Sequence, residues 1–438
     1  MKQVAQQILE EVVNMVENVN KRECSLEKSS ALRGYCEKTI CLPFDQTTYD
    51  DVLHDNTSFR NYLDFLIQEH SELFPSDITN GYWLHDFCRP SKKMNGFQMR
   101  RIISASTRKT YIIRPSFVMP YLTGKTDTVE KALFLLQFAV PYWGLTYVFG
   151  RNDMYWYRMA TAIGQHSIVG TTVKSADNLP QDLLADEKHT RFNGQKAYIA
   201  ATVGDDCVLG ASVSLTADTE GLTEAYAHFK AEAVGLKSDY QPQTVNTDGW
   251  RSTANSWKNL FPTIIIINCF LHAFLKIRNC AKQLKDVFIE VQQMVWDAYH
   301  ETTSTAFLNK INDLKIWTQK NIAHSTAKAA ILKLCLNAPA YCLAYDHPTA
   351  YRTSNMIDRA MNPMDRYLHE TRYFHGHLDT AECRIRAWAL IQNFSFYNPK
   401  TQRLKNKSSP FHTLNGFTYH KNWLHNLMIA TSMAGPPG

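Results

Sequence analysis

The most regular segment of the chain comprises residues 184–215, which have the sequence LADEKHTRFNGQKAYIAATVGDDCVLGASVSL. Asn193-Gly194 is typical of a two-residue hairpin turn, so the residues on either side are predicted to pair as antiparallel strands. Asp205-Asp206, after a glycine, is typical of a second turn, and a third strand follows it. The segment therefore predicts three successive antiparallel strands.

The residues that follow alternate between helical and strand patterns. Residues 219–234 have the apolar spacing of an amphipathic helix, residues 244–247 are a short buried strand, and residues 263–269 are a fifth strand. Three antiparallel strands, a crossover helix and two further strands predict an α/β fold with a mixed sheet.

Two carboxylates occupy strand positions at which a metal site can form. Asp186 lies on the first strand, Asp248 follows the fourth, and a crossover helix brings such strands together. Asp358, near the start of a helix predicted over residues 355–368, can approach from one side. Mg²⁺ needs only a few carboxylates beside water and phosphate oxygens, and two such ions activate phosphodiester cleavage. The alternative is that these acids are caps or turn residues. Glu187 is not a candidate, because it points to the opposite face of the strand from Asp186.

A cysteine and a histidine follow the fifth strand as Cys269-x-x-His272. One interpretation is a buried cysteine with a capping or core histidine. A zinc site needs two further ligands, and Cys280 offers only one at an unusual spacing. A third interpretation places His272 in an active site, close to a scissile phosphate.

Basic residues gather in the first third of the chain, after helices predicted over residues 3–20 and 59–74. Within residues 89–114 they alternate with aromatic and β-branched residues, as in a hairpin-like module that contacts phosphates; the candidates are Arg100, Arg101, Arg108 and Lys109. The alternative is a solvated basic surface.

A helix-turn-helix outline covers residues 129–163. One helix ends before Pro141, a short helix ends at Gly150, and a third begins at Asn152. The last helix would present Asn152, Tyr155 and Arg158 near one face, for contact with bases or phosphates. The alternative is that its aromatic residues form the core of a three-helix domain. A Gly- and Ser-rich linker is expected over residues 164–180.

Bulk composition narrows the class of protein. The 438 residues suggest two to four domains, and the net charge of +6 permits a nucleic-acid partner without requiring one. Ten scattered cysteines favour a reduced, cytoplasmic protein. The N-terminus has no apolar signal core, and no apolar run approaches the about 20 residues of a membrane span, so we expect neither secretion nor membrane insertion.

Four motifs in order resemble those of DDE/D-type insertion-sequence transposases, particularly those related to the Mutator superfamily. They are Ala185-Asp186-Glu187-Lys188-His189, Asn246-Thr247-Asp248-Gly249-Trp250, Cys269-x-x-His272 and Arg352-Thr353-Ser354-Asn355-Met356-Ile357-Asp358-Arg359. The resemblance covers roughly residues 125–395 and implies an RNase H-like catalytic domain with an all-helical insertion before the third acid.

The resemblance implies a DNA transposase that cleaves element ends and transfers strands to target DNA. Asp186, Asp248 and Asp358 would hold Mg²⁺ (or Mn²⁺), His272 would lie near the phosphate, and Cys269 would support it. Related enzymes usually carry Glu as the third acid, so Glu370 is a second candidate. The expected partners are terminal inverted repeats, target DNA and further copies of the chain, in the cytoplasm and on the nucleoid. The alternative is a derived DNA-binding protein that no longer cuts.

These expectations divide the chain into five parts. Residues 1–120 are a helical and basic region, and residues 121–170 a helix-turn-helix-like DNA-binding domain. Residues 181–278 and 346–395 form the RNase H-like domain, interrupted by a helical insertion over residues 279–345. Residues 396–438 are a basic loop and a final helix.

Overall fold

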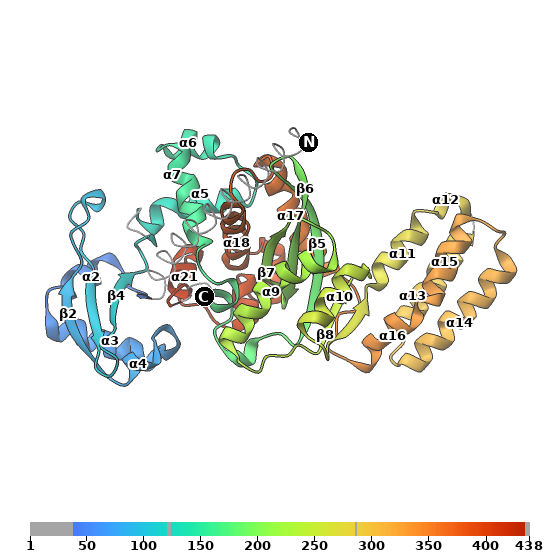
Figure 1. Cartoon of the computed structure of the whole chain (residues 1–438), viewed down its shortest axis with the longest axis horizontal. Coiled ribbons are helices and arrows are strands. Elements are labelled where there is room, and N and C mark those ends of the chain that lie inside the picture. The colour runs from blue at the N-terminus through green and yellow to red at the C-terminus, as the bar shows by residue number, and fades with distance from the viewer. Residues whose placement is uncertain (1–37, 121–123, 285–286, 434–438) are drawn as a thin grey trace, which may run out of the picture. The chain divides into compact units, whose positions relative to one another are not determined.

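The structure is a computed structural model, and it describes residues 38–120, 124–284 and 287–433. The chain divides into two compact units (Figure 1). Unit 1 comprises residues 1–128, 165–167 and 419–438, and unit 2 comprises residues 129–164 and 168–418. The helix expected over residues 3–20 lies outside the described residues. No helix of the described chain is long and apolar enough to cross a membrane.

Unit 1 is built on a four-stranded sheet in the order β1-β4-β3-β2. The strands are β1 (Thr39–Leu42), β2 (Tyr82–Phe87), β3 (Arg100–Ser104) and β4 (Thr110–Pro115). The β3–β4 pair is the hairpin expected in the basic segment, whereas β1 lies parallel to β4, a long-range pairing that the sequence analysis did not predict. Residues 38–120 are therefore a mixed α/β region, where the sequence predicted a helical and basic one.

Helices surround the core of unit 1. They are α2 (Gln46–Val52), α3 (Asn56–Glu69), α4 (Ser76–Thr79) and α21 (Trp423–Ala430). Ile429 of α21 packs in the same apolar cluster as Ile40, Leu63 and Ile113. The last helix of the chain therefore completes the core of the N-terminal sheet, because its apolar residues are fully buried there.

Unit 2 contains the predicted mixed sheet, with five strands in the order β7-β6-β5-β8-β9. They are β5 (Asp182–Phe192), β6 (Gln195–Gly204), β7 (Cys207–Ser214), β8 (Thr244–Thr247) and β9 (Ile265–Asn268). The strands β5, β6 and β7 pair antiparallel, and β5, β8 and β9 pair parallel. Positive φ angles at Asn193 (49°) and Gly194 (80°) confirm the tight turn between β5 and β6.

Helices cover both faces of this sheet (Figure 1). On one face lie α9 (Thr219–Leu236) and α10 (Arg251–Leu260), whose Phe229 and Trp257 pack with Leu183 and Ala185 of β5. On the other lie α17 (Asn355–Glu370), against β5 and β6, and α18 (Leu378–Phe394), against β7. The sheet is therefore buried between two helical layers.

Residues 164–180 are not a linker. They contain the helix α8 (Ile168–Thr172) and a 3₁₀ turn (Ala176–Asn178), and Val169 and Val173 are fully buried in the core under the sheet. Glycine and serine content suggested a flexible segment, but the apolar residues between them pack against α9 and fix it.

A separate helical array follows β9 in the sequence, as expected. It consists of α11 (Phe270–Arg278), α12 (Ala281–Leu284), α13 (Phe288–Tyr299), α14 (Ser304–Asn321), α15 (Thr326–Leu336) and α16 (Ala338–Asp346). These helices share their own apolar cluster, which includes Phe270, Phe307 and Tyr341. The array is therefore stabilised by packing among its own helices.

The remaining helices of unit 2 precede β5 or follow α18 in the sequence. They are α6 (Tyr142–Phe149), α7 (Asp153–Ile163), α19 (Pro399–Lys405) and α20 (Pro410–Asn415), and α5 (Thr126–Leu136) begins at the end of unit 1. The predicted helices over residues 143–149 and 152–163 are thus present, and α7 packs on α18.

Candidate active site

The strand register aligns three of the expected site residues. Leu184 of β5 pairs with Asn246 of β8, so Asp186 and Asp248, each two residues further on, lie at the same level and on the same face. Thr247 pairs with Asn268 of β9, so Asp248 and Cys269 are also level. Asp186, within β5, therefore lies at the same level as Asp248 and Cys269, which directly follow the neighbouring parallel strands β8 and β9.

Asp358 joins this group from the first turn of α17, the helix that packs on β5. Burial raises the pKa of Asp186 to about 6. Burial is the largest contribution to this net value; the negative charges of Asp248 and Asp358 add to the rise in the pKa, while the Glu187 backbone N–H and the charge of His272 oppose it. Asp248 and Asp358 are thus both close enough to act electrostatically on Asp186.

Glu370 is not part of this group. It lies at the other end of α17, twelve residues from Asp358, which corresponds to about 18 Å along a helix. Its side chain is half-exposed and lies near His369. Of the two candidates for the third acid, Asp358 is the one beside Asp186.

Ser354, just before α17, connects the expected site residues and was missed by the sequence analysis. Its Oγ donates to Asp358 Oδ2 at 2.9 Å and lies 3.3 Å from both His272 Nδ1 and Cys269 Sγ. Its backbone N–H donates to Cys269 Sγ at 3.2 Å. The only signal in the sequence is the spacing of four residues between Ser354 and Asp358, which places the two side chains together at the start of a helix.

Cys269 and His272 shift each other's pKa. The hydrogen bond with Cys269 raises the pKa of His272 to about 9 against the opposing effect of burial, and the charges of Asp358 and Asp186 add to the rise. Burial would raise the pKa of the Cys269 thiol, but hydrogen bonds with His272 and Ser354 outweigh it and lower that pKa. His272 is therefore cationic at neutral pH, which suits a position near a phosphate.

The donor chemistry of the site fits a divalent cation. No three His, Cys, Asp or Glu side chains of the described chain are close enough to form a complete metal-binding group. Mg²⁺, however, keeps several water ligands and takes only one or two carboxylates beside substrate oxygens. Burial, together with repulsion from Asp248 and Asp358, raises the pKa of Asp186, and a bound cation would relieve this repulsion.

Glu187, on the other face of β5, has a different environment. Its carboxylate accepts hydrogen bonds from the Tyr226 hydroxyl at 2.7 Å and from Thr253 Oγ1 at 2.8 and 2.9 Å. The pKa of Glu187 is raised to about 7, and burial is the largest cause. The charges of Asp186 and Asp248 also raise this pKa, whereas the hydrogen bonds from Tyr226 and Thr253 lower it. Glu187 ties β5 to α9 and to α10, the helix that follows Asp248.

The expectation for Arg100 as a DNA contact is corrected. Only 4% of this residue is exposed, its Nη1 donates to the Leu53 carbonyl at 3.0 Å, and its guanidinium lies over the rings of Phe59 and Phe87. A guanidinium enclosed in this way cannot reach a phosphate. Arg100 stabilises the core of unit 1.

The other basic candidates of unit 1 lie nearer the surface. Arg101 forms an ion pair with Asp86 of the neighbouring strand, which neutralises part of its charge. Arg108 and Lys109 are exposed in the turn between β3 and β4, and the Arg108 guanidinium lies 4.5 Å from the centre of the Trp83 ring. Of the four candidates, Arg108 and Lys109 are the most accessible.

The candidates in the predicted helix-turn-helix also include both exposed and partly buried residues. Asn152 caps α7, since its Oδ1 accepts from the Tyr155 N–H at 2.8 Å. Arg158 is exposed, whereas Tyr155 is half-buried with Arg151 over its ring. Trp156 is fully buried, so this aromatic residue belongs to the core, as the alternative interpretation had it.

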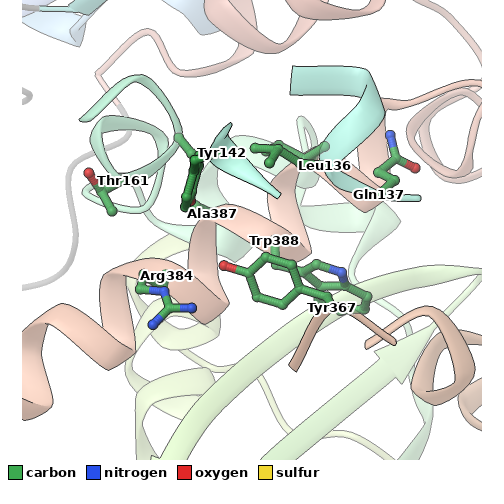
Figure 2. A pocket seen from close by; sticks show the side chains of 10 residues that line it. Leu136, Gln137, Tyr142, Thr161, Tyr367, Arg384, Ala387 and Trp388 are labelled. Atoms are coloured by element: carbon green, nitrogen blue, oxygen red, sulfur yellow. The ribbon is translucent and has the colours of Figure 1, made fainter. Parts of the chain in front are cut away.

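A pocket near these helices does not have the chemistry of the carboxylate site. It is lined by residues of α5–α7, α17 and α18, among them Gln137, Tyr142, Tyr367, Arg384 and Trp388 (Figure 2). None of the lining residues is acidic. The candidate active site is therefore the group at the strand ends and not this pocket.

Comparison with known proteins adds no assignment, because no protein-family model and no curated protein matches the chain.

Proposed function

We propose that this protein is a DDE/D-type DNA transposase with an RNase H-like catalytic domain. The observation that carries the proposal is the placement of Asp186 and Asp248 level on adjacent parallel strands, with Asp358 beside them on α17. The strand order β7-β6-β5-β8-β9, in which β6 is antiparallel to both neighbours, supports it, as do the four ordered motifs.

Asp186, Asp248 and Asp358 would hold the Mg²⁺ or Mn²⁺ ions that activate a nucleophile and stabilise a leaving oxygen in this chemistry. The cationic His272 beside them contributes positive charge toward a bound phosphate. Cys269 and Ser354 fix the His272 ring through hydrogen bonds. The protein supplies position and charge, which are the main requirements for reaction at an anionic phosphodiester.

The reaction consists of two displacements at phosphorus. In the first, water forms a P–O bond, the P–O3′ bond breaks, and the released 3′ oxygen takes a proton. In the second, that 3′-OH attacks a target phosphodiester and a target 3′-OH leaves, so no external energy source is required. The DNA partners are element ends and target DNA.

DNA contacts come from exposed basic residues in both units. Arg108 and Lys109 offer two charges in the β3–β4 turn of unit 1, and Arg158 offers one on α7 of unit 2. Contacts of this kind position phosphates and make affinity dependent on salt. Because element ends are joined in pairs, we propose that the protein acts as a homo-oligomer on DNA.

The test is strand cleavage of DNA that carries the sequences flanking the reading frame. With Mg²⁺ or Mn²⁺, the intact protein should nick these ends, leave 3′-OH groups and join them to a second duplex. Asp248→Ala should abolish both reactions and leave DNA retention nearly unchanged. An intact protein that binds the ends but neither nicks nor joins them would sink the proposal.

A second candidate is a transposase-derived protein that binds DNA without cutting it. It is favoured by Asp358, because related enzymes usually carry the longer Glu at this place. It predicts salt-sensitive DNA binding with no metal-dependent nicking. A nuclease unrelated to transposition would instead cut without giving joined products.

A further inference from the structure

We infer that Ser354 is the positioning residue that holds the third acid, Asp358, where a divalent cation can use it. The inference rests on the proposed function, since it assigns a role within the same metal site. It also explains how the shorter Asp can serve in place of Glu.

The hydrogen-bonding capacity of the Ser354 hydroxyl is fully used. A hydroxyl donates once and accepts twice. A carboxylate can only accept, so the Ser354 hydrogen is directed to Asp358 Oδ2 at 2.9 Å. The two lone pairs of Oγ then face His272 Nδ1 and Cys269 Sγ, each at 3.3 Å, which makes Nδ1–H the donor of the histidine.

Ser354 itself is rigidly held. Only 2% of the residue is exposed, and its backbone N–H donates to Cys269 Sγ at 3.2 Å. The preceding segment is tied to α11, because the Phe270 N–H donates to the Arg352 carbonyl at 3.1 Å. The hydroxyl is therefore fixed both to the end of β9 and to the start of α17.

This fixed donor determines the orientation of the Asp358 carboxylate. A hydrogen bond to Oδ2 fixes the carboxylate plane, and with it the direction in which the other oxygen, Oδ1, offers its lone pairs. Donors behind metal ligands act in this way, and their loss typically lowers metal affinity about 10- to 100-fold. One additional methylene, as in Glu, would move the carboxylate relative to Ser354 Oγ, so the hydrogen bond and the present oxygen positions could not both be kept.

The matched test compares Ser354→Ala with Ser212→Ala. Ser212 is equally buried and its Oγ lies 3.0 Å from His228 Nδ1, so it is a second serine–histidine pair in unit 2 that contacts none of the three acids. Mn²⁺ affinity is measured by calorimetry, and nicking is measured over a range of Mg²⁺ concentrations. DNA retention without metal is the control for folding.

Ser354→Ala should bind Mn²⁺ about tenfold more weakly and need correspondingly more Mg²⁺ for half-maximal nicking. Its rate at saturating Mg²⁺ should approach that of the intact protein, and Ser212→Ala should behave as the intact protein in both measurements. Unchanged metal affinity in Ser354→Ala would overturn the inference. If the intact protein itself bound no metal and cut no DNA, the proposed function would fail instead.

Asp358→Glu keeps Ser354 and provides an independent test if Ser354→Ala does not fold. It should also bind Mn²⁺ more weakly than the intact protein, because Glu cannot keep the Ser354 bond and the original oxygen position together. In a double-mutant cycle the two losses should be less than additive, since both remove the same hydrogen bond. Asp358→Glu with equal or higher Mn²⁺ affinity, or strictly additive losses, would contradict the role of Ser354.

Discussion

Asp186 and Glu187 are adjacent acids on the two faces of β5, and their environments are opposite. Glu187 is buried, and three hydrogen-bond contacts from Tyr226 and Thr253 satisfy its carboxylate. Asp186 accepts from the Glu187 backbone N–H and lies beside two further acids. Glu187 is thus satisfied within the fold, whereas Asp186 faces the negative charges of Asp248 and Asp358, which the charge of His272 opposes. This difference is the reason why we propose the Asp186 face of the sheet, and not the Glu187 face, as the site of chemistry.

The largest expected effect is on the Asp186 face. Asp186→Asn should lower nicking about 10³-fold, because it removes a charged metal ligand. Without metal, the same variant should raise the free energy of unfolding, since it removes repulsion with Asp248 and Asp358. Nicking assays and urea unfolding test the two effects, and a variant that was both active and less stable would make Asp186 a structural residue.

The opposite result is expected on the Glu187 face. Glu187→Ala should lower the free energy of unfolding by about 2–4 kcal/mol, because the buried hydroxyls of Tyr226 and Thr253 lose their acceptor. Glu187→Gln keeps an acceptor of similar shape and should cost about 1 kcal/mol. Urea unfolding measures both. Equal losses in the two variants would show that charge, and not hydrogen bonding, is the contribution of Glu187.

The pH dependence of stability should reflect both faces. Burial raises the pKa of Asp186 from 3.8 to about 6 and that of Glu187 from 4.5 to about 7. The folded state therefore binds these protons more tightly, so the free energy of unfolding falls as pH rises from about 4 to about 7. At about 1.4 kcal/mol per pKa unit, the two shifts together set an upper limit of about 6 kcal/mol for this loss in metal-free protein. Asp186→Asn should remove the fall in the free energy of unfolding that occurs below about pH 6. Glu187→Gln should remove the fall that extends up to about pH 7. A free energy of unfolding that did not change with pH in the parent protein would contradict both assignments.

The smallest effect concerns the basic residues of unit 1. Replacing Arg108 and Lys109 together by Ala should weaken DNA binding uniformly across sequences and reduce the salt slope by about 2, without loss of stability. Arg100→Ala should instead destabilise the fold, because the guanidinium holds the Leu53 carbonyl. Filter binding over a range of salt concentrations distinguishes the double variant from Arg100→Ala. If DNA affinity in the double variant depended on salt as in the intact protein, Arg108 and Lys109 would not contact DNA.

The sequence by itself determined the local parts of unit 2. The hairpin turn at Asn193-Gly194, the strands β5 and β6 on either side of it, and the helices α7 and α9 follow from turn chemistry and apolar spacing, which act between near neighbours. Asp186 and Asp248 could be placed because each lies at or beyond a recognisable strand. The tertiary structure was needed to align them in register.

Contacts between distant residues were decided only by the tertiary structure. Ser354 meets Cys269 across 85 positions, β1 pairs with β4, and Arg100 is enclosed by aromatic rings rather than exposed. Nothing in the local spacing specifies such pairs, because they result from how whole helices and strands pack to bury apolar surface. The sequence singled out the three acids, but it did not show that Ser354 donates a hydrogen bond to Asp358.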